Sequence, residues 1–215
     1  LMSEMMVFTS LFSTYMRYRL GLRRCDDVFA DGLFDPVTNP TGWQEAVPVT
    51  CFEPASHLIA SSWWHLAPGA INTFALIISS YTIVLALKIA KSHDYKAPSG
   101  FLGSLMPTKK AAIRNYLIIT LALGTMFIVL KLVEWSHLIA EGFTIGTEQG
   151  SIFYVATGAH GVHVFAGLLV MLYMIFKADT VEWSEENAQG IEYFGLYWHF
   201  VDLAWVVIFP AFYLY

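Results

Sequence analysis

The sequence predicts an all-α protein, a polytopic bundle of five transmembrane helices in a single membrane domain, and three observations support this prediction. Hydrophobic residues make up 56% of the 215 residues and charged residues only 13%, about half of the roughly 25% found in an ordinary soluble domain. The mean hydropathy is +0.54. Apolar stretches of about 20 residues, the length of a helix that crosses a bilayer, recur along the chain. This composition argues against a soluble enzyme, a disordered chain and a collagen-like fibre.

Five apolar segments are candidates for the spanning helices. The second contains no charged residue, the fourth contains no Asp, Glu, Lys or Arg, and the fifth contains only Asp202. The first is short for a span, so we expect further residues upstream of Leu1. In chain order the predicted spans are residues 1–16, 66–87, 115–139, 151–176 and 193–215.

Prolines, aromatic residues and small residues refine these spans. Pro68 fits the first turn of the second span, and Pro210 should kink the fifth span or loosen its last turn. Small residues in the second and fourth spans predict close helix packing. The Trp and Tyr residues near the proposed span ends are typical of an interface belt. They are Trp63, Trp64, Trp135, Tyr154, Tyr213 and Tyr215.

The charges of the connections predict their side of the membrane. Residues 88–114 carry six Lys and Arg against one acid, Asp94, and basic loops stay in the cytoplasm. We therefore expect residues 88–114 inside and the long loop 17–65 outside, although four arginines near the start of that loop run against this assignment. Cys25 and Cys51 would then lie in an oxidising compartment, either bridged by a disulfide or as two unpaired thiols.

The overall charge limits the choice of partner. The chain has 12 Lys and Arg against 17 Asp and Glu, and a formal net charge of −5. Because no basic stripe or nucleic-acid motif is present, we expect no nucleic-acid partner.

Several ionisable residues lie inside the predicted spans, where each costs at least a few kcal/mol unless it is paired or neutral. Lys131 and Glu134 are three residues apart on one helix face, so they can pair, and His137 follows on the same stripe. The remaining ionisable residues at membrane depth are Glu4, His160, His163, His199 and Asp202.

Three interpretations of these residues compete. Histidines on facing helices can bind a metal or haem, but a di-iron bundle needs two Glu-x-x-His motifs, and only Glu134 and His137 form one. A proton path or transport site is the second. The third, which the spacing favours, is a polar network that holds helices together at roughly 0.6–2 kcal/mol per hydrogen bond. We expect that network to join Glu134, His160, His163, His199 and Asp202 between the last three spans.

Two long motifs resemble the signature of subunit III of the haem–copper respiratory oxidases, the cytochrome c and quinol oxidase subunit III family. The first is FYVATGAHGVHV at residues 153–164, and the second is YWHFVDLAW at residues 197–205. Shorter stretches at residues 1–8, 72–73 and 133–135 also match. The chain looks like the five-helix form of the family, apart from its long loop 17–65.

The resemblance implies a non-catalytic subunit of a proton-pumping terminal oxidase that reduces oxygen to water. Such a subunit has no catalytic, cofactor-binding or metal-binding residue of its own, so haem and copper are expected in partner subunits. It packs directly against subunit I, meets subunit II and other oxidase subunits, holds phospholipid and supports proton uptake. Glu4 matches the family's buried glutamate and is the residue expected to influence proton delivery or lipid order.

The resemblance also implies a multi-pass protein of the bacterial plasma membrane, with loop 17–65 as a candidate contact for an electron-donor complex. Two alternatives stay open at this point. One is an accessory subunit of a related nitric oxide reductase, and the other is a free-standing proton-coupled membrane carrier.

Overall fold

The computed structural model describes residues 2–21, 63–92, 94–95, 106–140, 143–146, 148–183 and 187–214. These residues form five α-helices and one short π-helix. The elements are α1 (Met2–Gly21), α4 (Trp63–Lys91), α6 (Lys109–Ala140), α7 (Glu148–Ala178), α8 (Gln189–Phe209) and the π-helix η1 (Pro210–Leu214). The all-α prediction is confirmed for these described residues.

Four of the described helices are long and apolar enough to cross a membrane: α4, α6, α7 and α8 with its π-helical extension. Helix α1 does not meet this criterion. Its 20 residues include Glu4, two arginines and several hydroxyl side chains, which lower its hydropathy. The structure therefore supports four of the five predicted spans and leaves the first without support as a span.

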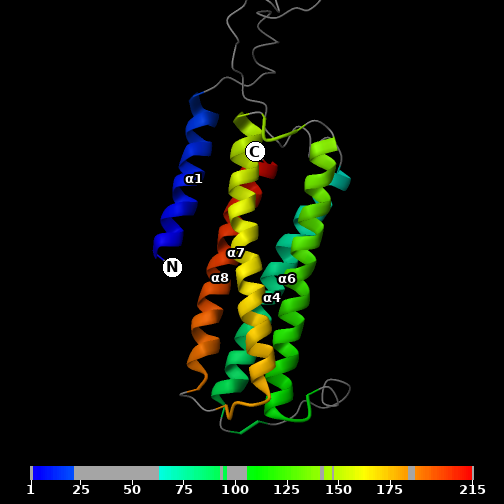
Figure 1. Cartoon of the computed structure of the whole chain (residues 1–215), viewed down its shortest axis with the longest axis vertical. Helices are drawn as coiled ribbons and strands as arrows, with labels where there is room; N and C mark the ends of the chain where they lie inside the picture. The colour runs from blue at the N-terminus through cyan, green and yellow to red at the C-terminus, as the bar shows by residue number, and fades with distance from the viewer. Residues whose placement is uncertain are drawn as a thin grey trace, which may run out of the picture.

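The helices run side by side along the long axis of the molecule (Figure 1). Helix α4 packs against α6 and α8, and α7 packs against α6, α8 and α1. Figure 1 shows α1 beside the half of the bundle that contains the C-terminus. The Tyr15 hydroxyl donates a hydrogen bond to the Ala211 carbonyl at 2.6 Å and fastens α1 there.

Glycines allow the closest helix contacts, as small residues do in membrane bundles generally. A Cβ atom on Gly167 of α7 would lie 2.6 Å from the indole ring of Trp198 on α8. A Cβ atom on Gly69 of α4 would lie 2.6 Å from the ring of Phe209. The expected close packing of the second and fourth spans is therefore confirmed at these two positions, whereas Gly161 has no atom within 4 Å of its Cβ position.

Most helix boundaries lie a few residues outside the predicted ones, and the differences at α4 and α6 have consequences. Helix α4 begins at Trp63, so Pro68 lies inside it rather than in its first turn, which corrects the prediction for this residue. Helix α6 begins at Lys109, six residues before the predicted start at Asn115, and so includes Lys109, Lys110 and Arg114. Pro210 does stop α8 and begins η1, as predicted for the last turn.

Most of the long loop 17–65 lies outside the described residues. Its first residues, to Gly21, continue α1, and its last three belong to α4. Cys25 and Cys51 lie outside the described residues, so the disulfide between them stays a prediction.

Candidate functional site

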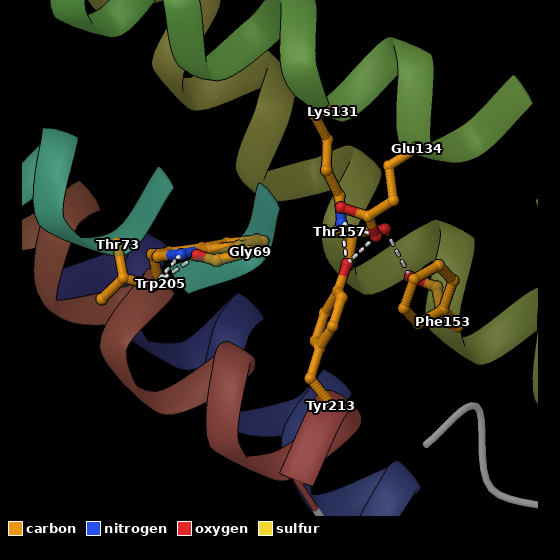
Figure 2. Close-up of polar contacts among 8 residues, drawn as sticks. All are labelled: Gly69, Thr73, Lys131, Glu134, Phe153, Thr157, Trp205 and Tyr213. Atoms are coloured by element: carbon orange, nitrogen blue, oxygen red, sulfur yellow. Dashed lines mark hydrogen bonds and ion pairs between the residues drawn. The ribbon is translucent and has the colours of Figure 1, made fainter. Parts of the chain in front are cut away.

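A buried ion pair lies on α6 near the end of the bundle that holds the C-terminus. The Nζ atom of Lys131 is 2.9 Å from Oε1 of Glu134, one turn along the helix. The two residues are only 5% and 9% exposed. Tyr213 of η1 joins the pair: its hydroxyl donates to Glu134 Oε1 and accepts from Lys131 Nζ (Figure 2). The pairing predicted from the i,i+3 spacing is confirmed, and Tyr213 extends it into what we call the triad, Lys131, Glu134 and Tyr213.

Aromatic rings surround the ammonium group of the triad. Lys131 Nζ lies 4.6 Å from the ring centroid of Tyr213, 5.0 Å from that of Trp205 and 5.3 Å from that of Phe153. Ring faces attract a cation, and the attraction grows when water is excluded. The carboxylate and the three rings together offset the cost of keeping a charge at this depth.

The π-helix brings Tyr213 to the ion pair. Pro210 lacks a backbone N–H and cannot continue the regular hydrogen bonding of α8. Helix α8 therefore ends at Phe209 and the chain continues as η1. Tyr213 is fully buried, which contradicts its predicted place in an interface belt. Tyr154, another residue predicted for that belt, is 6% exposed and donates its hydroxyl to the Phe143 carbonyl at 2.8 Å.

Trp205 of α8 connects the triad to α4 and α7. Its indole Nε1 donates to Thr73 Oγ1 at 3.1 Å, and that hydroxyl donates to the Gly69 carbonyl at 2.9 Å (Figure 2). The ring centroids of His160 and Trp205 are 5.1 Å apart. His160 is fully buried, and neither of its ring nitrogens has a hydrogen-bond partner among the described residues. His160 therefore contacts its neighbours through its ring, against Trp205 and Phe127, and not through hydrogen bonds.

Glu4 and His163 connect α1 to α7. Glu4 Oε2 lies 2.8 Å from His163 Nε2, and His163 Nδ1 lies 2.7 Å from the Ala159 carbonyl. A carbonyl only accepts hydrogen bonds, so Nδ1 carries a hydrogen. A proton is consequently shared between Nε2 and the Glu4 carboxyl. The two side chains are 18% exposed for His163 and 38% for Glu4, so this pair lies at the edge of the bundle.

Asp202 connects α8 to α4. Its Oδ2 atom accepts a hydrogen bond from the Ser80 hydroxyl at 3.0 Å, and Asp202 is 4% exposed. His199, one turn earlier, is exposed on the outside of α8. His137, near the end of α6, is exposed as well.

The structure does not bring the predicted polar residues into one network. Glu134 lies in the triad, His163 with Glu4, Asp202 with Ser80, His160 among rings and His199 on the surface. The reason is geometric: residues at i and i+3 are about 60° apart around a helix, so one can face the core while the other faces outward. The predicted common core of Glu134, His160, His163, His199 and Asp202 is corrected to three separate contacts.

The partners that sequence reasoning missed are Tyr213, Thr73 and Ser80. Each is far from its partner along the chain, by 82 residues for Tyr213 and Lys131, so no local spacing indicates them. Within the described ranges, no group of three His, Cys, Asp or Glu side chains lies close enough to hold a metal ion.

Apolar spans joined by buried hydrogen bonds and one buried ion pair define a multi-pass helical membrane protein. The family model for cytochrome c oxidase subunit III matches residues 102–215, more than half of the chain. The chain belongs to the cytochrome c oxidase subunit III family, as the two motifs at residues 153–164 and 197–205 predicted.

Curated relatives agree with this assignment. The chain is 29% identical over 214 residues to the probable cytochrome c oxidase subunit 3 of Mycobacterium leprae (strain TN), covering 99% of this chain and 83% of the relative. It is 27% identical over the same length to the corresponding protein of Nocardia farcinica. It is also 32% identical over 146 residues to the probable quinol oxidase subunit 3 of Staphylococcus saprophyticus, covering 67% of this chain and 65% of the relative.

Proposed function

We propose that this chain is the non-catalytic subunit III of a proton-pumping terminal oxidase, whose partner subunits reduce oxygen to water. The observation that carries the proposal is the family match over residues 102–215, which includes both long motifs. The contacts of the buried polar residues support it, because Lys131, Glu134 and Asp202 all make hydrogen bonds to another helical element.

The partners in this proposal are subunit I, in direct contact, and subunit II with the other oxidase subunits. Haem and copper belong to those partners. The protein lies in the bacterial plasma membrane with residues 88–114 on the cytoplasmic side, as the positive charge of that connection favours. Loop 17–65 is a candidate contact for a donor complex.

Glu4 is the residue proposed to support proton uptake. Its carboxyl shares a proton with His163 at 2.8 Å, and the pair lies at the edge of the bundle, where a partner subunit can exchange protons with it. Glu4→Gln keeps a hydrogen-bonding group but cannot exchange the proton, whereas Glu4→Asp keeps the acid. We expect slower proton uptake in the first variant and near-normal uptake in the second, measured by pH changes in vesicles that contain the whole oxidase.

A phospholipid is the proposed ligand of a groove between α1 and α8. The groove has a volume of about 320 Å³ and an almost wholly apolar lining that includes Phe8, Phe12, Leu203 and Val207. Phe8 also lies 5.2 Å from the His163 ring, so the groove begins beside the Glu4–His163 pair. An acyl chain matches this lining, and mass spectrometry of the intact complex tests for the retained lipid.

The experiment that tests the proposal is purification of this chain with an affinity tag from its own membranes in a mild detergent. We expect stoichiometric co-purification of larger subunits that contain both haem and copper, identified by absorption spectra and metal analysis. Haem with non-haem iron would instead assign the chain to a related nitric oxide reductase. Recovery of the chain alone, with transport activity, would indicate a proton-coupled carrier.

A further inference from the structure

The outward face of α4 is suited to contact with lipid. Ile71, Phe74, Ile78 and Tyr81 are spaced three and four residues apart, and each is between 51% and 67% exposed. These are large side chains, and the face they form has no charged residue. Hydrocarbon tails cover such a surface without loss, because they are as apolar as the side chains.

The outward face of α8 differs at one position. Leu196, Leu203 and Val206 form its stripe and are 55%, 51% and 39% exposed. His199 belongs to the same stripe by its spacing of three, four and three residues, and it is also exposed. It lies ten residues from Gln189 and 14 from Tyr213, the ends of the span that α8 and η1 form together, so it sits near the middle of the span. More than two turns from a span end, no other ionisable Asp, Glu, Lys, Arg or His of the described spans is exposed.

An imidazole at this depth is not compatible with lipid contact. Ionisable groups inside a membrane face a bundle interior or a partner, because hydrocarbon offers neither hydrogen-bond donors nor acceptors. Within the described part of the chain, His199 has no hydrogen-bond partner, and Asp202 points its Oδ2 atom at Ser80 on α4. That bond fixes the rotation of α8 and keeps His199 on the outside.

We infer that the α8 stripe, residues 196, 199, 203 and 206, is the docking face for a transmembrane helix of a partner oxidase subunit, with Leu203 at the edge that this face shares with the apolar groove. The helix would present a hydroxyl, carboxyl or backbone carbonyl group to the His199 imidazole. Lipid headgroups lie at the bilayer surfaces and do not reach the middle of the span. A single polar residue in an otherwise apolar contact stripe sets the register of the helix pair. This inference rests on the proposed function, since it assigns a face to the association with oxidase subunits.

Photocrosslinking in the intact oxidase tests the docking face. The photocrosslinking residue p-benzoylphenylalanine is placed at Leu196 or Val206 on the stripe. In the matched controls it is placed at Phe74 or Ile78 on α4. We expect products that join the stripe positions to a membrane segment of another subunit, identified by mass spectrometry, and none from α4. Absence of such products from a complex that still contains this chain, or products with a second copy of this chain, would overturn the inference while the proposed function stands.

A second measurement tests the polar contact itself. His199→Leu keeps an exposed side chain of similar size but removes both ring nitrogens, and His199→Gln retains hydrogen bonding. We expect His199→Leu to lower the fraction of oxidase that keeps this chain after a stringent detergent wash about tenfold, as the loss of one hydrogen bond between membrane helices would, and His199→Gln to lower it much less. Equal retention of the leucine variant and the unsubstituted chain would overturn the inference. Failure of the unsubstituted chain to co-purify with any haem–copper subunit would contradict the proposed function instead.

Discussion

At one end of the bundle charged side chains meet near solvent, whereas at the other end they meet inside the protein. At the first end, Lys91 lies 2.8 Å from Glu192 and Arg114 lies 2.6 Å from Asp179, with side chains that are 37% to 53% exposed. We call this the basic end, residues 88–92, 94–95, 106–114, 177–183 and 187–192. The triad of Lys131, Glu134 and Tyr213 lies toward the opposite end and is buried.

The same pairing chemistry has unequal weight at the two ends. Water screens an exposed ion pair, which contributes about 0–1 kcal/mol to the free energy of unfolding. Removing one partner of a buried pair leaves an uncompensated charge and costs about 3–5 kcal/mol. Burial, rather than the distance between the charges, therefore decides which contacts the fold depends on.

The largest expected effect follows from breaking the triad. Glu134→Leu leaves the Lys131 ammonium buried without its carboxylate, so we expect the free energy of unfolding to fall by about 3–5 kcal/mol. The double variant Lys131→Met with Glu134→Leu removes both charges and should be clearly more stable than the single variant. Thermal unfolding of the purified complex, followed for this chain, measures both. A double variant as unstable as Glu134→Leu would contradict the electrostatic account.

Helix packing between the two ends should give the next largest effect. Gly167→Ala places a methyl group 2.6 Å from the Trp198 ring, and overpacking of this kind costs about 1–3 kcal/mol. The control is Gly161→Ala on the same helix, where no atom lies within 4 Å of the new Cβ. The control should unfold at the same temperature as the unsubstituted chain or slightly higher, because Ala favours helix. Equal stability of the two variants would show that α7 and α8 separate easily.

A smaller loss of stability is expected when Asp202 is replaced. Asp202→Leu removes the bond from Ser80, and a hydrogen bond between membrane helices contributes about 0.6–2 kcal/mol. Asp202→Asn retains an acceptor and should preserve most of this contribution. We expect lower assembly or stability of the leucine variant without abolition of oxygen reduction, measured as subunit content and turnover. Normal stability and subunit content of a purified Asp202→Leu complex would contradict this prediction.

The sequence predicts the later four spans and the Lys131–Glu134 pair because both depend on local information. A span needs only length and lack of charge, and the ion pair needs only a spacing of three residues on one helix. The single polar core was not predicted correctly, since the outside of a membrane bundle is as apolar as its inside. Hydrophobic periodicity therefore cannot predict which way a polar residue of α8 faces. Asp202 faces α4, whereas His199, one turn away on the same helix, faces outward.

The smallest expected effect lies at the basic end and separates two kinds of charged contact there. Arg114→Ala removes only the exposed pair with Asp179 and should change the free energy of unfolding by less than about 1 kcal/mol. Lys109 differs, because its Nζ atom donates to the Ser92 carbonyl at 2.8 Å and to the Trp183 carbonyl at 2.9 Å. These bonds join the connections that follow α4 and α7, so Lys109→Met should destabilise more than Arg114→Ala. Unfolding temperatures in low and high salt measure both effects. Because salt screens exposed ion pairs most strongly, Arg114→Ala and the unsubstituted chain should unfold at the same temperature in high salt. Lys109→Met should still unfold at a lower temperature than the unsubstituted chain.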